Sequence, residues 1–146
     1  MSHFTPQEIA YLQGQRVGRL ATVNEKGEPH IAPVGFMYNP ALDAIEIGSA
    51  KPEFERSKKY RDAERTGKVA FMVDDAVESP PSAGGGGGAG AQIRGIEIRG
   101  VAEAHLTGGD ELRPGNYPAY LRIRPTRIIS YGINSPGYQP DARNVG

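Results

Sequence analysis

The sequence predicts a mostly β (α+β) fold, an antiparallel barrel of about six short strands with two peripheral helices. Aromatic and β-branched residues gather in short runs, separated by many of the 20 glycines and 12 prolines, a pattern typical of strands joined by turns. The runs follow one another at the spacing of hairpins. Only one of the segments that connect them contains a convincing helix, and because parallel strands need such crossover connections, this disfavours a parallel sheet. A chain of 146 residues suits a single domain over residues 1–146 with a proper core.

The first helix is expected directly after Thr5. Thr5 is a capping residue, Pro6 suits the first helical position, and Glu8 stands three residues after the cap. Together these residues form the signature of a helix start. Gly14 is a suitable stop, so we expect a short helix that lies over the barrel like a lid.

The strands are expected where apolar residues recur between turns. Their predicted ranges are residues 17–23, 30–38, 44–49, 68–73, 92–106 and 120–133. A turn at residues 24–27 joins the first two strands into a hairpin, and Pro33 places the second at an edge or a bulge. Gly95 and Gly100 predict bulges where the fifth strand bends.

The remaining segments are a second helix, a loop and a tail. The helix is expected over residues 52–65, which are dense in charge. A flexible glycine-rich loop is expected over about residues 76–91, because five glycines run from Gly84 to Gly88 and polyglycine is typical of a tether. Residues 134–146, rich in Pro, Gly and Asn, are expected to form an irregular tail.

Charge and composition exclude several classes of function. The 17 basic and 17 acidic residues cancel, so no excess charge favours nucleic acid or a membrane surface. The chain has no cysteine and its three histidines show no metal-ligand spacing, so no metal site is expected. Residues 1–13 lack the pattern of a signal peptide, and no apolar run approaches the roughly 20 residues that span a bilayer. We therefore expect a soluble cytoplasmic protein.

The most informative polar cluster is Arg56-Ser57-Lys58-Lys59, near the start of the second helix. A helix N-terminus offers unpaired N–H groups and partial positive charge, and cationic side chains add further donors, which favours a phosphate. The alternative is a solvated helix face, because the neighbouring acids Glu53 and Asp62 have the spacing to pair with these cations. Composition alone favours the alternative.

Two other polar features carry weaker signals. Asp74-Asp75 ends the fourth predicted strand and is interpreted as a turn device, because Asp readily bonds its own backbone. His30 is interpreted as a half-buried strand residue. No nucleophile motif or phosphate-binding glycine loop is present.

The order of these pieces resembles the pyridoxamine-phosphate-oxidase-like, FMN-binding split-barrel superfamily, and the resemblance covers most of the chain. The segments that carry it are residues 18–23 (GRLATV), 27–36 (GEPHIAPVGF), 45–48 (IEIG), 57–59 (SKK), 68–75 (KVAFMVDD), 96–104 (IEIRGVAEA) and 124–133 (RPTRIISYGI). The glycine-rich loop looks like an insertion. The resemblance implies a six-stranded antiparallel split β-barrel.

The resemblance also implies a homodimer with cofactor sites at its interface. Residues 32–36, with Pro33, Val34 and Gly35 at their centre, would then lie along the cofactor ring. Gly48 and Ser49 would lie beside them. Ser57, Lys58 and Lys59, with Arg56 close by, match the phosphate-binding Ser-Arg-Lys cluster of the family, so the resemblance implies that these four residues bind the cofactor phosphate.

Within the superfamily, the chain looks most similar to the branch that uses coenzyme F420, a deazaflavin. This implies an oxidoreductase that transfers a hydride from reduced F420 to a small organic acceptor with an activated C=C or C=N bond. Ala32 stands where an arginine helps hold the FMN phosphate in pyridoxamine phosphate oxidases, and the tail offers Arg143 alone for their C-terminal Arg-His pair, so that reaction is not expected.

Three alternatives stay open at this point. The first is an FMN-dependent oxidoreductase or flavin reductase on the same fold. The second is a non-catalytic protein that carries or sequesters the cofactor or a related tetrapyrrole. The third is an interaction module that binds no cofactor. No residue is assigned as the catalytic acid or base.

Overall fold

The computed structural model describes residues 1–78, 91–135 and 139–146. Its strands are β1 (Val17–Val23), β2 (Pro29–Gly35), β3 (Met37–Asn39), β4 (Ala44–Ile47), β5 (Lys68–Glu78), β6 (Ala91–His105), β7 (Tyr120–Tyr131) and β8 (Pro140–Asn144). Its helices are α1 (Pro6–Gln13), α2 (Lys58–Thr66), the short α3 (Gly109–Leu112) and a 3-10 turn, η1 (Phe54–Arg56). The mostly β fold expected from the sequence is confirmed, with more strands than the six predicted.

The strands form one antiparallel sheet in the order β2-β1-β5-β6-β7-β4-β3, and β8 pairs with β7 beyond the end of β4. β2 and β3 are the two ends of this order, yet Phe36 alone separates them in the chain. The sheet therefore curls until its two edges approach each other at Phe36. No backbone pairing between β2 and β3 closes the described sheet, so the fold is a split barrel.

The core fills the inside of this curl. Its largest fully buried apolar side chains are Leu12, Leu20, Ile45, Ile47, Tyr60, Phe71, Ile96, Ile98, Leu121, Ile123 and Ile128. Phe71 packs edge-to-face on Phe36, with ring centroids 5.2 Å apart. A Cβ at Gly18 would lie 2.2 Å from the Phe71 ring, so glycine at this position of β1 lets the ring occupy the centre of the barrel.

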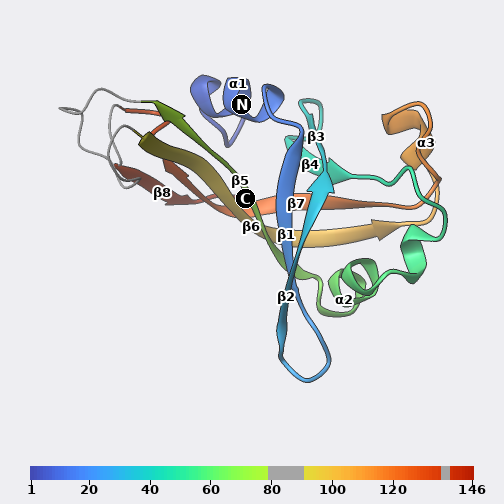
Figure 1. The fold of residues 1–146 in the computed structure, drawn as a ribbon. Coiled ribbons are helices and arrows are strands. Elements are labelled where there is room, and N and C mark those ends of the chain that lie inside the picture. The colour runs from blue at the N-terminus through green and yellow to red at the C-terminus, as the bar shows by residue number, and fades with distance from the viewer. Residues whose placement is uncertain (79–90, 136–138) are drawn as a thin grey trace.

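The helices sit at the ends of the barrel (Figure 1), with α2 and α3 at one end of the sheet. α1 begins with the predicted capping box, in which Thr5 accepts from the Glu8 N–H and Glu8 accepts from the Thr5 N–H. No helix among the described residues has the length and apolar character needed to cross a membrane.

The predicted strand at residues 30–38 is divided in two. Its first part is β2, which pairs with β1 alone and is therefore an edge strand, as Pro33 indicated. Its second part is β3, which pairs with β4. A bulge is present between Arg99 and Gly100, whereas the register of β6 runs through Gly95 without a shift, so the prediction of a bulge was confirmed at Gly100 and was wrong at Gly95.

The irregular tail predicted over residues 134–146 was wrong, because residues 140–144 form β8. This strand has no alternation of apolar residues that the sequence would reveal. Its backbone pairs with β7, and Arg143 forms an ion pair with Glu8 of α1. Both interactions are long-range and become visible in the folded chain alone.

The predicted glycine-rich loop is shorter at both ends than expected. β5 continues to Glu78 and β6 begins at Ala91, so residues 76–78 and 91 lie in strands. Residues 79–90, with the glycine run, lie outside the described residues.

The interpretation of Asp74-Asp75 as a turn device was also wrong, because both residues lie within β5. Asp75 accepts two hydrogen bonds from the Arg94 guanidinium, at 2.8 and 3.0 Å, and a third from the Tyr11 hydroxyl at 2.9 Å. Hydrogen bonds from Arg94, which outweigh the effect of burial, lower the pKa of Asp75. Asp75 therefore links β5 to β6 and α1.

Candidate functional site

A cavity of about 440 Å³ opens where the two edges of the split barrel meet. It is called the cationic cavity here, and it is lined by Pro33, Val34, Gly35, Phe36, Met37, Gly48, Ser49, Ala50, Lys51, Lys59, Arg113, Pro114, Gly115 and Asn116. These residues come from the β2–β3 junction, the end of β4, the first turn of α2 and the turn after α3. Segments far apart in the sequence therefore meet at one site.

The charges of this cavity all have the same sign. Lys51, Lys59 and Arg113 line it, and its lining contains no Asp or Glu. Within the described residues none of these three cations forms an ion pair, although the Lys59 ammonium lies 5.8 Å from the centre of the Phe54 ring. Unneutralised cations beside a concave surface attract an anionic ligand.

The first turn of α2 brings Lys59 to this cavity. Ser57 is the N-cap, where its hydroxyl accepts from the Tyr60 N–H at 3.3 Å and donates to the Phe54 carbonyl at 2.7 Å. The helix ends at Gly67, which adopts φ = 66°. Because each helical residue advances by about 100°, Lys58 and Lys59 point in different directions.

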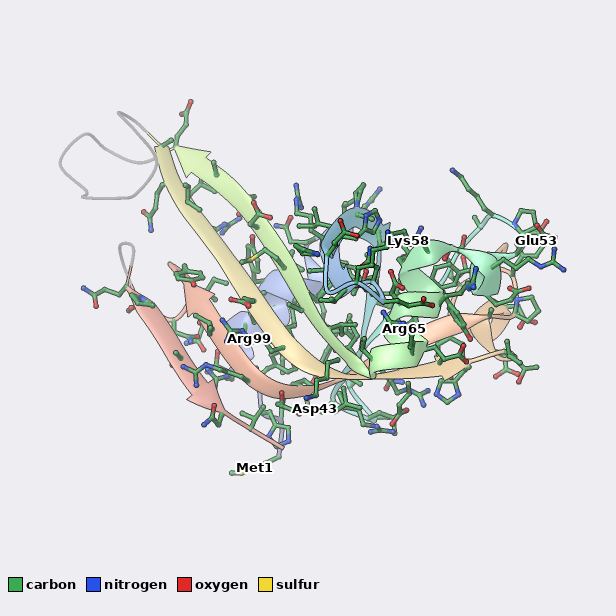
Figure 2. The ribbon with its side chains drawn as sticks, turned by 90° about the horizontal axis from the view of Figure 1, so that it is seen from below. Met1, Asp43, Glu53, Lys58, Arg65 and Arg99 are labelled. Atoms are coloured by element: carbon green, nitrogen blue, oxygen red, sulfur yellow. The ribbon has the colours of Figure 1, made fainter. Side chains whose placement is uncertain are left out.

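Lys58 instead lines a second cavity of about 550 Å³ between α2 and the β1–β2 hairpin, called the hairpin cavity here. Its charged lining residues are Glu25, Lys26, Glu28, Arg56, Lys58, Arg61, Asp62, Glu64 and Arg65. Figure 2 shows Lys58 and Arg65 on α2, and both pair with Asp62, at 3.1 and 3.4 Å. Acids and bases are mixed in this cavity, so it offers an anion little net attraction.

The structure therefore divides the residues predicted from the sequence. Pro33, Val34, Gly35, Gly48, Ser49 and Lys59 come together in the cationic cavity, whereas Arg56 and Lys58 line the hairpin cavity. Ser57 lines neither cavity. Arg56 lies 3.3 Å from Glu53 and Lys58 pairs with Asp62, which are pairings of the kind that the solvated-face interpretation describes.

Sequence reasoning missed Lys51, Arg113 and Asn116. Lys51 follows the end of β4, and the other two belong to the run Arg113-Pro114-Gly115-Asn116 in a segment treated as a loop. The Pro-Gly pair in that run predicts a turn. Nothing in the sequence indicates that this turn lies against β4.

The lining also limits the chemistry. It contains no Asp, Glu, His or Tyr, and its ionisable side chains are Lys51, Lys59 and Arg113. The lining also includes the exposed Gly35, the half-buried Gly48 and the buried, apolar Val34 and Phe36. Such a cavity suits a ligand with an anionic part and a largely apolar part.

The fold and the site thus define a split barrel with an anion-attracting cavity at its open edge. The chain matches the family described as pyridoxamine 5'-phosphate oxidase over residues 4–129. This match covers most of the chain, which therefore belongs to that family.

A curated relative adds a reaction type. The chain is 40% identical over 130 residues, 89% of this chain and 84% of the relative, to a 5a,11a-dehydrotetracycline/5a,11a-dehydrooxytetracycline reductase of Streptomyces rimosus. The family and this relative are both named as oxidoreductases, which supports an oxidoreductase function for this chain.

Solved structures share the fold at lower identity. An FAD binding protein from Mycobacterium smegmatis aligns with a TM-score of 0.58 and 17% identity, covering 97% of this chain and 98% of that one. General Stress Protein 26 from Bacillus anthracis aligns with a TM-score of 0.61 and 18% identity, covering 95% and 96%. These likenesses confirm the split barrel.

Proposed function

We propose that the chain is a reductase that uses reduced coenzyme F420 to transfer a hydride to an activated C=C bond of a small organic acceptor. The observation that carries the proposal is the cationic cavity, in which Lys51, Lys59 and Arg113 are present without a lining carboxylate. The Streptomyces relative is named as a reductase of 5a,11a-dehydro compounds, and because that prefix denotes a C=C bond, the name favours C=C over C=N.

The residues of the cavity fit such a cofactor. When bound, reduced F420 supplies a hydride, which is a two-electron donor. Lys59 and the adjoining N-terminal turn of α2 would hold its phosphate, because cationic donors and a helix N-terminus both favour phosphate. Residues 33–35 and 48–49 would border its ring. Phe36 and Val34, both buried, would keep water from that side.

A second candidate is an FMN-dependent oxidoreductase on the same site. The family description and the FAD-binding neighbour favour it, and FMN also carries a phosphate. The departure at Ala32 weakens the case for FMN, since it removes a cation that pyridoxamine phosphate oxidases use to hold the FMN phosphate.

Titration of the purified protein separates these candidates. We expect a lower Kd for F420 than for FMN, and consumption of reduced F420 when a cyclic enone is added. A lower Kd for FMN with flavin-dependent turnover would support the second candidate instead. Binding of F420 without turnover on a panel of enones, quinones and imines would indicate a carrier, and affinity for neither cofactor would contradict both reductase proposals.

We further propose that the protein is a homodimer. Val17, Val23, Ile31 and Val101 are exposed large apolar side chains on β1, β2 and β6. Val23 and Val101 line a third, mostly apolar cavity of about 460 Å³, a surface suited to a second copy of the chain. Light scattering is expected to give twice the mass of the chain for the natural protein and the mass of one chain for Val101→Glu; an unchanged dimer would exclude this face.

A further inference from the structure

The turn Arg113-Pro114-Gly115-Asn116 forms one wall of the cationic cavity, and backbone hydrogen bonds close it and attach its C-terminal end to Ser49. The Asn116 N–H donates to the Arg113 carbonyl at 3.1 Å, and the Tyr117 N–H donates to the Ser49 carbonyl at 2.8 Å. Gly115 adopts φ = 93°, which a residue with a side chain rarely does. The backbone is thus tied to the end of β4.

The side chains of this turn are left without partners. Among the described residues, neither the Arg113 guanidinium nor the Asn116 amide forms a hydrogen bond or an ion pair, and both line the cavity. This contrasts with other arginines near the sheet surface, such as Arg124, which binds Glu103. A fixed backbone that presents two unpaired polar side chains to a cavity is the arrangement expected of ligand-binding groups.

Gly48 is what allows Asn116 to take this position. A Cβ at Gly48 would lie 2.5 Å from the Asn116 Nδ2 atom and 3.3 Å from its Cγ atom. The Asn116 amide therefore lies directly over the end of β4, in the space that a side chain at position 48 would fill.

The three cations of the cavity come from separate segments of the chain, and Lys51 follows the end of β4. Lys59 lies in the first turn of α2, where the free N–H groups of the helix add to its attraction for phosphate. Arg113 lies in the turn after α3, at the same end of the sheet (Figure 1) but on a different element. Lys59 can therefore bind the cofactor phosphate while Arg113 faces the acceptor.

We propose that Arg113 is a catalytic residue that binds the carbonyl oxygen of an α,β-unsaturated ketone, and that Asn116 orients this acceptor. The proposal rests on the proposed reductase function and names the acceptor class of the same site. Both side chains donate hydrogen bonds to a ketone oxygen, and an isolated alkene offers them no acceptor.

The chemistry requires such a donor. The β-carbon would accept a hydride that reduced F420 supplies, and F420 would be oxidised by two electrons. As the new C–H bond forms, the C=C π bond breaks. Its electron pair forms a new double bond between the α-carbon and the carbonyl carbon, and the carbonyl π pair moves onto oxygen to give an enolate. Arg113 stays protonated and stabilises this oxyanion. A water molecule then protonates the α-carbon, and the hydroxide left behind is neutralised by the proton that the cofactor would release on oxidation, so the two-electron reduction needs no acidic side chain.

The first test compares Arg113→Gln with Lys59→Ala, using Arg124→Gln as a control outside the cavity. For Arg113→Gln we expect kcat for a cyclic enone to fall by about 10²–10³-fold, the usual loss for an oxyanion donor. We expect its Kd for F420 to stay within about twofold, because the phosphate is bound elsewhere, and Arg113→Lys to recover part of the activity.

The second test measures the binding of an enolate and needs no turnover. The probe is 1,3-cyclohexanedione, a stable enolate at neutral pH, titrated into the protein loaded with oxidised F420. We expect Arg113→Gln to weaken its binding by about tenfold or more, the effect of one charge-assisted hydrogen bond, and Arg124→Gln to leave it unchanged. An unchanged enolate affinity, or a loss of F420 affinity equal to that of Lys59→Ala, overturns the assignment of Arg113. If the natural protein binds no F420, the proposed function itself has failed.

The role of Asn116 is tested separately through Gly48. Gly48→Ala places a methyl group where the Asn116 amide lies, so Gly48→Ala and Asn116→Ala are expected to raise KM for the enone by similar factors. Because Gly48 also borders the proposed cofactor site, the F420 Kd of both variants is measured alongside and is expected to stay within about twofold. Because both changes remove the same amide from the same place, the double variant is expected to be no worse than either single variant. Effects that multiply in the double variant would contradict the assignment of Asn116.

Discussion

Two regions of this protein use charge in opposite ways. In the first, which we call the clasp, Glu8 of α1 and Arg143 of β8 form an ion pair, and Glu8 also accepts hydrogen bonds from Ser130 at 2.8 Å and Asn134 at 2.9 Å. Glu8 is completely buried. In the second, the cationic cavity, three cations line a concave surface without a lining carboxylate.

The difference between these two regions shows how to distinguish charged residues that stabilise the fold from charged residues that are available to bind a ligand. A buried carboxylate whose oxygens are all occupied has no capacity left for a ligand, and it joins the two ends of the chain. Cations that lack protein partners contribute little to folding, because solvent screens them, and keep their capacity for an anion. The pairing of a charge is therefore more informative than its sign or its place in the sequence.

The largest expected effect is the loss of the clasp. Arg143→Ala leaves the Glu8 carboxylate buried without its cation, so we expect the free energy of unfolding to fall by roughly 3–5 kcal/mol. Urea unfolding measures this. The control is Arg127→Ala, which removes a guanidinium that donates to Asn144 of β8, the strand that also carries Arg143. We expect this variant to lose much less free energy of unfolding. Equal losses of unfolding free energy in the two variants would show that the clasp contributes no more to stability than an ordinary surface contact.

The next effect is on ligand binding. Lys59→Ala removes an unpaired cation of the cationic cavity, and we expect the Kd for F420 to rise by about 10–100-fold, since hydrogen bonds to charged groups contribute about 1.5–3 kcal/mol. The melting temperature is expected to stay nearly constant. Titration followed by fluorescence measures the first quantity and calorimetry the second. A large fall in melting temperature with an unchanged Kd would reverse the distinction between the two regions.

Acid is expected to weaken the clasp. Burial raises the pKa of Glu8, but hydrogen bonds from Arg143, the Thr5 N–H, Ser130 and Asn134 outweigh it and hold the pKa below its ordinary value of 4.5. The folded state therefore binds a proton less readily than the unfolded state. Stability from the clasp is complete above about pH 4.5 and is lost as the pH falls through the folded pKa of Glu8.

The measurement is urea unfolding as a function of pH. The natural protein is expected to lose stability steeply in acid, whereas Glu8→Gln is less stable at neutral pH and has a shallower acid slope. The same slope in both proteins would mean that other carboxyl groups, such as Asp43 and Asp75, dominate the acid response.

The smallest effect is expected at Lys58, which is a matched control for its neighbour Lys59. Lys58 is half exposed and paired with Asp62 one turn along α2, so Lys58→Ala is expected to change the F420 Kd by less than about twofold and the melting temperature by about 2 °C or less. A rise in Kd equal to that of Lys59→Ala would show that the phosphate-binding group extends over both lysines, as the resemblance of residues 56–59 to the family implies.

The sequence by itself determined the local elements. The capping box at Thr5, the edge strand at Pro33 and the bulge at Gly100 each follow from the chemistry of neighbouring residues, which is why a single chain reveals them. Order and spacing of short motifs were enough to indicate the split barrel. The sequence also identified part of the cationic cavity, because residues 33–35 and 48 lie in those motifs and residue 49 directly follows one of them.

The tertiary structure alone decided which charges meet. β8 has no apolar alternation, so its existence depends on pairing with β7 and on the contact of Arg143 with Glu8, 135 residues earlier. The direction of each side chain on α2 separated Lys59 from Lys58, and the attachment of Tyr117 to Ser49 brought Arg113 to the cavity. Local propensity acts over a few residues, whereas these pairings join distant segments, and folding of the whole barrel is what brings them together.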